Sequence, residues 1–302
     1  MTDQQSLLNG RVVLITGAGR GIGRAAALAM ASAGAAVLVN DVDAAAAEAV
    51  VEDILARSGR AASYVAAIGS AEAADAGVAR AIEAFGRLDV MACNAGILRD
   101  RVLWNTADDD FDAVIETHLR GTFTCARAAA RHFREAGLGG RLILVSSIAG
   151  QRGNFGQTAY AAAKAGIAAM ARTWSLELKR YNVTVNAIVP NALTAMTQTV
   201  PALAPLVEAL QRGEDVPQRF REEWGIGGPE DVAPAFVYLA SDRSAQITGQ
   251  CIGIGGDRLS VWTHPTEADY RLRAGGWTAD TLADALEGPL HPQLQDVGIE
   301  FN

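Results

Sequence analysis

The segment TGAGRGIG, residues 16–23, decides the fold of this chain. It directly follows the apolar run RVVLI and opens the alanine-rich run RAAALAMASAG. A strand, a glycine-rich turn and a helix in this order are typical of a dinucleotide-binding βαβ unit. Gly17, Gly21 and Gly23 would let the backbone turn tightly and approach a pyrophosphate, while the helix N-terminus offers unpaired N–H groups to its charge. A plain strand-to-helix turn would not need this density of glycine.

Two charged residues near this turn bear on which dinucleotide binds. Asp41 follows the next apolar run, AAVLVN. An acidic side chain at that position can bind both ribose hydroxyls of NAD and would repel a 2′-phosphate. Arg20, inside the glycine turn, favours NADP, because a basic residue there can contact that phosphate. We rank NAD first, since Asp41 holds the discriminating position whereas Arg20 could serve the pyrophosphate or solvent. Asp43 is expected to be a helix N-cap.

Apolar runs continue to alternate with helix-like segments along the chain. After RVVLIT and AAVLVN, further strand-like runs lie at 61–68, 88–94, 141–147 and 183–189. Helices are expected at 21–33, 43–58, 71–85, 109–135 and 158–180. This is the βαβ pattern, and runs without polar alternation suit parallel strands that helices cover on both faces. No Pro-rich or Ser-rich linker divides residues 10–255, so we expect one α/β domain.

Two regions depart from this alternation. Residues 194–228 combine prolines, an apolar helix-like piece and a charged piece, at the point where a doubly wound sheet places its substrate crevice. They predict a lid on a catalytic domain of residues 1–256, with an ordinary surface insertion as the alternative. Residues 257–302 form a C-terminal extension without a regular period, which could cover a neighbouring surface or subunit.

The composition narrows the class of partner. A chain of 302 residues with 50% hydrophobic residues can bury a sizeable core. Its net charge of −8 argues against a nucleic-acid or anionic-membrane surface, so a small-molecule partner is expected. The opening MTDQQSLLNG has neither the basic nor the apolar part of an export signal, and we expect a cytoplasmic protein. The longest apolar stretch, residues 25–39, is too short to span a bilayer.

The cysteines do not indicate a metal or redox site. Cys93, Cys125 and Cys251 lie far apart and lack the paired spacing of such motifs. We expect three reduced, mostly buried thiols and no bound metal.

A second group of residues has the spacing of a proton-transfer site. Tyr160 and Lys164 stand four positions apart in TAYAAAKAG, so on a helix they share one face. A neighbouring cation favours the phenolate and would lower the pKa of the tyrosine from about 10. Ser147 ends the run RLILVSS, where its hydroxyl could bind a reacting oxygen at the carboxyl end of a strand. Each feature alone is commonly a surface pair or a strand-end serine, and only the combination with the glycine turn indicates a redox enzyme.

With TGAGRGIG, NAG at 94–96 and the serine, tyrosine and lysine in this order, the chain resembles the short-chain dehydrogenase/reductase family over residues 10–255. The resemblance implies a single Rossmann-type, doubly wound parallel sheet of about seven strands with helices on both faces. It also implies that Tyr160 exchanges the proton, Ser147 orients the substrate oxygen and Lys164 binds the nicotinamide ribose. The cofactor contacts that it implies are Gly17, Arg20, Gly21, Ile22, Gly23, Asp41, Asn94, Ala95, Gly96, Tyr160, Lys164, Pro190 and Thr194.

Four segments, GILRDR, HLRGTF, GNFGQTAYAAAKAG and PNALTAMTQT, resemble a narrower group. This group contains the (3R)-hydroxyacyl-CoA dehydrogenase part of peroxisomal multifunctional enzymes of type 2 and bacterial relatives acting on acyl-CoA or steroid-derived acyl-CoA. His118 stands where the wider family usually has an active-site asparagine, and it either replaces that residue or merely packs. The adenine-facing Asp is missing near Ile68, and Pro190 is followed by Asn191 instead of Gly. The chain ends in GIEFN, unlike an SKL-type peroxisomal address.

These observations favour NAD-dependent oxidation of a secondary alcohol to a ketone, on a 3-hydroxyacyl-CoA or a steroid-like substrate. The alternatives are an NADPH-dependent 3-oxoacyl-carrier reductase, a sugar or polyol dehydrogenase, and a nucleotide-sensing binding protein with little turnover. The resemblance also implies a homodimer or homotetramer.

Overall fold

The computed structural model describes residues 7–200 and 202–299. The strands are β1 (Val12–Thr16), β2 (Ala36–Asp41), β3 (Arg60–Val65), β4 (Val90–Cys93), β5 (Gly140–Val145), β6 (Val183–Pro190), β7 (Cys251–Gly255) and β8 (Arg258–Trp262). The α-helices are α1 (Gly21–Ser32), α2 (Ala44–Ala56), α3 (Ala71–Phe85), α4 (Asp108–Ile115), α5 (Gly121–Ala136), α6 (Ile148–Arg152), α7 (Thr158–Leu178), α8 (Ala204–Gln211), α9 (Gln218–Glu222), α10 (Ala233–Ala240) and α11 (Ala279–Glu287). A π-helical turn, Glu116–Arg120, joins α4 to α5.

One sheet runs through the molecule in the order β3-β2-β1-β4-β5-β6-β7-β8. The first seven of these strands pair in parallel. The order reverses between β1 and β4, and the carboxyl ends of strands on either side of such a switch point border a ligand crevice. The predicted α/β fold and its doubly wound parallel sheet are therefore confirmed.

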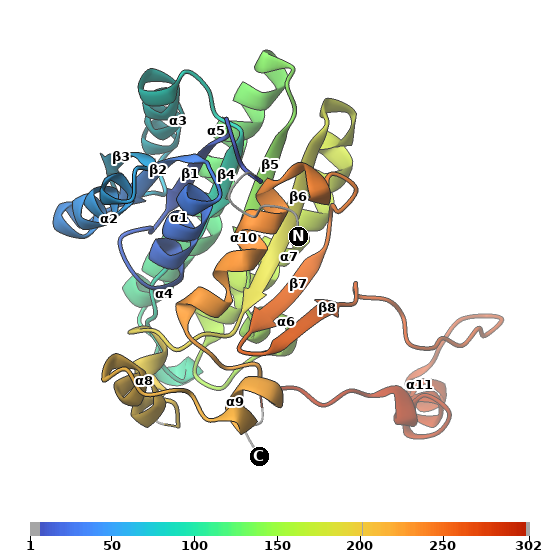
Figure 1. Ribbon diagram of the computed structural model, residues 1–302. Helices are drawn as coiled ribbons and strands as arrows, with labels where there is room; N and C mark the ends of the chain where they lie inside the picture. The colour runs from blue at the N-terminus through green and yellow to red at the C-terminus, as the bar shows by residue number, and fades with distance from the viewer. Residues whose placement is uncertain (1–6, 201, 300–302) are drawn as a thin grey trace.

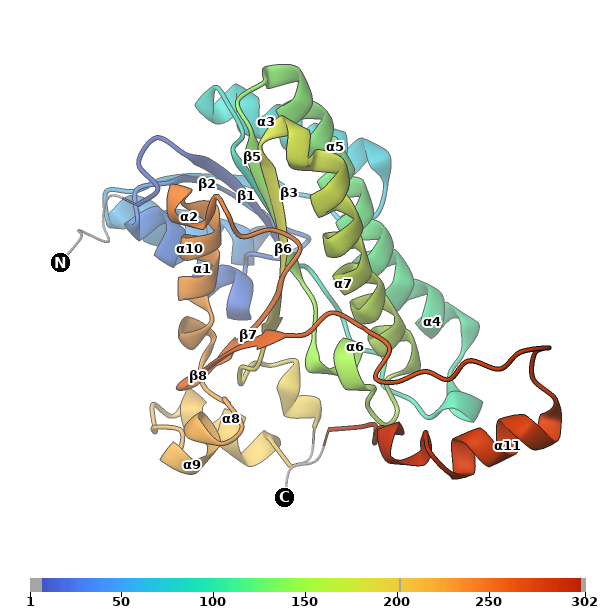
Figure 2. The ribbon, with the colours of Figure 1, turned by 90° about the vertical axis from the view of Figure 1, so that its right-hand side faces the viewer.

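Two apolar layers hold the helices against the sheet. Figures 1 and 2 show α1, α2 and α10 on one face and α3, α5 and α7 on the other. The first layer contains Met30 and Phe236, and the second contains Phe133 and Ile167, all at most 1% exposed. Strands β1, β4 and β5 are buried along their whole length, which explains why their sequences show no polar alternation.

The eighth strand was not predicted. β8 pairs antiparallel with β7 across a turn at Gly256, whose φ of +48° is left-handed. Leu259 and Val261 of β8 are about 70% exposed (72% and 68%), while Trp262 packs against the core. Sequence patterns for strands assume that the apolar residues face the core. In β8 two of them face solvent, so the strand was not recognised within the extension.

The two irregular regions take different forms. Residues 194–228 carry α8 and α9 below the carboxyl ends of the strands (Figures 1 and 2). They have a small apolar cluster of their own, around Leu203, Val207 and Ile226. The chain after β8 leaves the body, forms α11 and returns to α6, where Arg152 bonds the backbone of Asp296 and Gly298. The first residues of MTDQQSLLNG and the last of GIEFN lie outside the described residues.

The three cysteines are buried free thiols, as predicted. The helix expected over 109–135 is interrupted by the π-helical turn, which places His118 inward. None of the helices in the described part of the chain combines the length and apolarity needed to cross a bilayer.

Candidate active site

The glycine turn after β1 is packed so closely that side chains would not fit. A Cβ on Gly17 would lie 2.7 Å from the Cα of Ala95, and its φ of +62° is left-handed. A Cβ on Gly23 would lie 2.1 Å from the carbonyl oxygen of Gly17. Gly21, with a φ of +52°, faces Thr194 at the start of the lid region. Side chains at Gly17 and Gly23 would therefore clash with the surrounding backbone, and Ile22 packs half-buried against the core.

Asp41 lies at the carboxyl end of β2 with its side chain turned toward the glycine turn. Its Oδ2 accepts a hydrogen bond from the backbone N–H of Gly19 at 2.9 Å, and the residue is only 7% exposed. Arg20 points away, and its guanidinium pairs with Asp43 at 2.8 Å in an exposed position. Asp43 also accepts from the N–H of Ala46, which confirms it as the N-cap of α2. The acidic group is therefore turned toward the glycine turn, and the basic group is held away from it in an ion pair.

The NAG segment braces the turn from the neighbouring strand. The Nδ2 atom of Asn94 donates to the carbonyl oxygens of Thr16 and Gly17, both at 3.0 Å. The hydroxyl of Thr16 in turn accepts from the N–H groups of Asn94 and Ala95. The side chain of Asn94 thus fixes the backbone at the start of the glycine turn.

Ser147, Tyr160 and Lys164 come together at the carboxyl end of β5. Ser147 caps α6, accepting from the N–H of Ala149 at 3.2 Å, and its side chain is near enough to the Tyr160 hydroxyl to lower the pKa of the phenol. The Nζ atom of Lys164 lies 5.5 Å from the centre of the Tyr160 ring and donates to the carbonyl oxygen of Val145 at 2.7 Å. Gly150, which the sequence did not single out, allows this arrangement, since a Cβ there would lie 2.6 Å from the backbone of α7.

Burial dominates the proton affinities of this site. It raises the pKa of Tyr160 to about 12, although the hydrogen bond with Ser147 opposes the rise and the charge of Asp100 adds to it. Desolvation lowers the pKa of Lys164 to about 7. The lowered tyrosine pKa expected from a neighbouring cation is therefore absent, because loss of solvent raises the pKa of Tyr160 and leaves Lys164 itself only partly charged near neutral pH.

His118 projects from the π-helical turn into the same region. Its ring meets the Tyr160 ring edge-on at 5.1 Å between centres, and Nε2 lies within hydrogen-bonding distance of both the N–H and the carbonyl oxygen of Ile97. Burial, and then the charge of Lys164, lower its pKa to about 3, so the ring is neutral. Its Nδ1 atom is buried and has no partner among the described residues. Gly96 makes room for the ring, since a Cβ there would lie 2.2 Å from it.

Asp100 is a neighbour of Tyr160 that the sequence did not mark. It lies in GILRDR, and its Oδ2 accepts from the Nε2 of Gln157 at 2.8 Å. Both segments were noted only as family resemblance, because nothing in their spacing shows that they meet.

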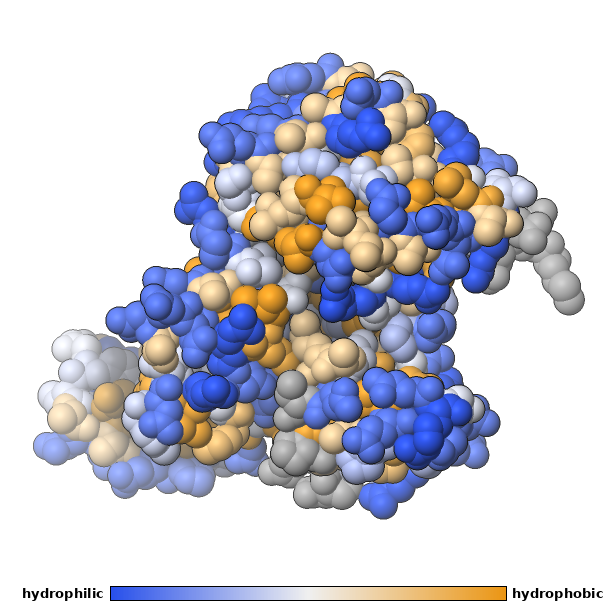
Figure 3. Space-filling model, turned by 90° about the vertical axis from the view of Figure 1, so that its left-hand side faces the viewer, coloured by the Kyte–Doolittle hydropathy of each residue, from blue (hydrophilic) through white to orange (hydrophobic). Residues whose placement is uncertain are grey.

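Pro190 and Thr194 lie where the sheet passes into the lid region. Pro190 ends β6, and the next residue, Asn191, donates through Nδ2 to the carbonyl oxygen of Trp224 at 2.7 Å. Figure 3 shows a hollow between the upper body and the lower part of the molecule, bordered by hydrophobic residues. The structure thus brings together, at one edge of the sheet, the predicted site residues that follow five strands and those on α7 and the π-helical turn. Ile68, where the adenine-facing Asp is missing, instead faces Gly121 of α5.

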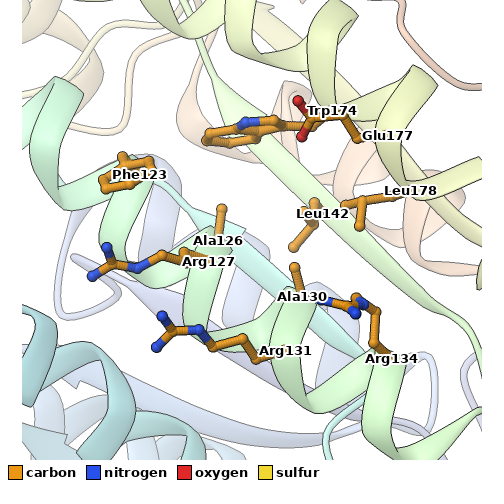
Figure 4. Close-up of a pocket in the computed structure, with 10 residues that line it drawn as sticks. All are labelled: Phe123, Ala126, Arg127, Ala130, Arg131, Arg134, Leu142, Trp174, Glu177 and Leu178. Atoms are coloured by element: carbon orange, nitrogen blue, oxygen red, sulfur yellow. The ribbon is translucent and has the colours of Figure 1, made fainter.

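A cavity of about 260 Å³ lies elsewhere, between α5 and α7 (Figure 4). Trp174 on its wall lies fourteen residues after Tyr160, roughly 20 Å farther along the helix. The wall combines apolar side chains with Arg127, Arg131 and Arg134. This groove is therefore a feature of the outer helical face and not of the catalytic crevice.

Comparison with known proteins agrees with this arrangement. The model of the family described as short chain dehydrogenase matches residues 11–203. A crystal structure of a short chain dehydrogenase from Mycobacterium avium superposes with a TM-score of 0.84 at 36% identity, covering 98% of this chain and 100% of that one.

Three relatives with named activities are similar over most of this chain. Peroxisomal multifunctional enzyme type 2 of Mus musculus is 38% identical over 92% of the chain, which spans only 36% of that enzyme. A hydroxyacyl-CoA dehydrogenase of Mycobacterium tuberculosis is 39% identical over 93% of the chain and 90% of its own length. A 3-oxoacyl-[acyl-carrier-protein] reductase of Thermotoga maritima is 38% identical over 82% of the chain and 98% of its own length.

Proposed function

Because this chain belongs to the short-chain dehydrogenase family and is an NAD(P)-linked oxidoreductase acting on a CH–OH group, we propose that it uses NAD to interconvert a secondary alcohol and a ketone. The proposed substrate is a 3-hydroxyacyl-CoA or a steroid-like alcohol. The observation that supports the reaction best is the meeting of Ser147, Tyr160 and Lys164 beside the glycine turn. The names of two relatives, a hydroxyacyl-CoA dehydrogenase and a multifunctional enzyme, support the substrate class.

The choice of NAD rests on the charges at the ribose end. Asp41 presents a buried carboxylate beside the glycine turn, and a phosphate there would meet like charge. Arg20 is paired with Asp43, so binding a 2′-phosphate would require it to leave that ion pair.

The proton steps of the reaction fall to the chain's own residues. The nicotinamide, when bound, takes or gives the hydride at the substrate carbon. In the oxidation, Tyr160 accepts the hydroxyl proton of the alcohol while Ser147 donates a hydrogen bond to the same oxygen; in the reduction, Tyr160 returns that proton. Burial opposes both the phenolate and the ammonium, so a proton that passes from Tyr160 to Lys164 leaves a buried ion pair with no change in net charge.

His118 extends this proton path in our proposal. A neutral imidazole with one nitrogen on Ile97 and the other unpaired can accept or donate a hydrogen bond at Nδ1 without becoming charged. An asparagine amide at this position could also accept or donate such a hydrogen bond. The tautomer is set by whether Nε2 donates to the carbonyl of Ile97 or accepts from its N–H.

Residues 194–228 act as the substrate lid in this proposal, and residues 257–302 remain an extension of the catalytic domain. The lid has its own small core and is joined to the sheet through the bond from Asn191. A lid with an apolar cluster beside the crevice would suit a bulky apolar substrate better than a sugar or polyol.

The outer face of α5 and α7 supports pairing with a second copy of this chain. Phe123 lines the groove of Figure 4 and is 40% exposed, and Leu176 of α7 is 78% exposed. Apolar side chains in a groove on two long helices are typical of a homodimer or homotetramer contact.

The same site supports one alternative enzyme. An NADPH-dependent 3-oxoacyl-carrier reductase would use the same three catalytic residues in the opposite direction, and the similar reductase of Thermotoga maritima supports it. A nucleotide-sensing protein with little turnover is less well supported, because binding alone gives no reason to bury a tyrosine and a lysine together.

Turnover tests these proposals directly. The protein would be assayed with NAD and NADP separately, against (3R)- and (3S)-hydroxyacyl-CoAs, steroid alcohols and simple polyols. We expect NAD-linked oxidation of a hydroxyacyl-CoA or steroid alcohol. Activity only with NADP would reject the cofactor assignment, and activity only with polyols would reject the substrate class.

A further inference from the structure

Asp100 lies where two loops are fastened together beside Tyr160. The N–H of Arg101 donates to the carbonyl oxygen of Gly156 at 2.8 Å, which joins the loop after β4 to the loop before α7. Next to this bond, Gln157 donates to Asp100 Oδ2 and accepts from the Nδ2 of Asn154 at 3.0 Å. Gln157 is the residue immediately before α7, so this link determines where the first turn of α7, and with it Tyr160, sits.

Only one oxygen of this carboxylate is used by the fold. Asp100 Oδ1 is buried and has no hydrogen-bond partner among residues 7–200 and 202–299. An unpaired buried carboxylate oxygen costs stability, and an amide would serve the bond to Gln157 as well. The negative charge is therefore not explained by the loop contact alone.

The negative charge of Asp100 affects the proton affinity of Tyr160. Burial is the main cause of the raised tyrosine pKa, and repulsion by Asp100 raises it further. The other titratable groups that face the phenol are Lys164 on α7 and the neutral His118 on the π-helical turn. Arg99 pairs with Asp110 at 3.5 Å, and Arg101 donates to the backbone of Asp100, so neither forms an ion pair with this carboxylate.

We propose that Asp100 is a positioning residue of the reaction, which anchors the start of α7 through Gln157 and keeps a negative charge beside the Tyr160 phenol. It favours the protonated tyrosine, the form that donates to a carbonyl, over the form that accepts a proton from an alcohol. The inference rests on the proposed function of Tyr160.

The test is the pH profile of kcat/KM for alcohol oxidation in the wild type and in Asp100→Asn. Oxidation requires deprotonated Tyr160, and removing a negative charge makes deprotonation easier. The alkaline rise in activity should therefore shift to lower pH, by about half to one unit for a charge at this range. Asp100→Glu should restore the wild-type profile, and Asp75→Asn, the same change on the exposed face of α3, should leave it in place.

A second variant separates the charge from the anchor. Gln157→Leu removes the link but keeps the carboxylate, so it should lower the plateau of kcat without moving the profile to lower pH. An unshifted profile in Asp100→Asn with normal plateau activity would overturn the charge role. A wild type that shows no NAD(P)-linked turnover with any alcohol would overturn the proposed function instead, before any variant is compared.

Discussion

At the glycine end of the crevice, polar side chains bond to the backbone, whereas at the catalytic end two side chains each keep one buried polar atom without a partner in the described chain. Asn94 and Asp41 hold the turn through bonds to main-chain atoms. His118 Nδ1 and Asp100 Oδ1, by contrast, are buried without a partner in the described chain. The glycine end is thus held in shape for binding. At the catalytic end, the unpaired buried atoms cost stability, and we expect them to find partners only when a substrate binds. Variants should therefore separate affinity from chemistry.

Tyr160→Phe should give the largest effect, confined to the catalytic end. Loss of the proton-transfer group is expected to lower turnover by about 10²–10⁴-fold. The glycine turn is untouched, so the Kd for NAD should change little. Steady-state kinetics and calorimetric titration with NAD measure the two quantities. Turnover that persists unchanged would contradict the assigned chemistry.

Asp41→Ala should affect the other end. Loss of charge-assisted hydrogen bonds to the ribose, worth about 1.5–3 kcal/mol, should weaken NAD binding by about 10–100-fold and relax the discrimination against NADP. The kcat at saturating cofactor should stay close to that of the wild type. Asp75→Asn, the loss of one carboxylate charge on the exposed face of α3, is the matched control. A wild type that already prefers NADP would refute the role of Asp41.

Lys164→Met should remove activity and yet stabilise the protein. The folded pKa of about 7 lies below the ordinary 10.5, so between these values the unfolded chain binds more protons and stability rises with pH. Below pH 7 the lysine is charged in both states, so the folded protein bears the full cost of burying that charge. Methionine has no charge to bury and avoids this penalty, but it leaves the carbonyl oxygen of Val145 without its donor. We therefore expect a net gain in the free energy of unfolding of about 1 kcal/mol. Urea unfolding at pH 6.5 measures this gain, which should be smaller at pH 9. A variant less stable than the wild type at pH 6.5 would contradict the cost assigned to the buried lysine.

The glycine end could be predicted from the sequence because its parts are local. TGAGRGIG sits between its strand and its helix, and Asp41 ends the next strand, so order along the chain gives position in space. The family, the doubly wound sheet and the meeting of Ser147 with Tyr160 and Lys164 followed from the same reasoning.

The rest depended on contacts between distant segments. Asp100 meets Gln157 across fifty-seven positions, and Gly150 allows α6 to touch α7, neither of which has a period or a spacing. The raised pKa of Tyr160 was missed because burial, which the sequence does not display, outweighs the neighbouring cation. β8 was missed because its apolar residues face outward.

His118→Asn should produce the smallest change and so measure how far the catalytic end tolerates repacking. An amide can replace the bond to Ile97 and offer a further polar atom, so turnover should fall by no more than about fivefold, the value of one ordinary hydrogen bond. The smaller side chain leaves space against Tyr160, and stability should drop by about 1–2 kcal/mol. With a pKa of about 3, the histidine stays neutral above pH 5, so its replacement should add or remove no limb of the pH profile in that range. His118→Leu, which fills the space without polar atoms, is the control. If it keeps the activity of the asparagine variant, His118 only packs; if it loses about tenfold more, the imidazole belongs to the proton path.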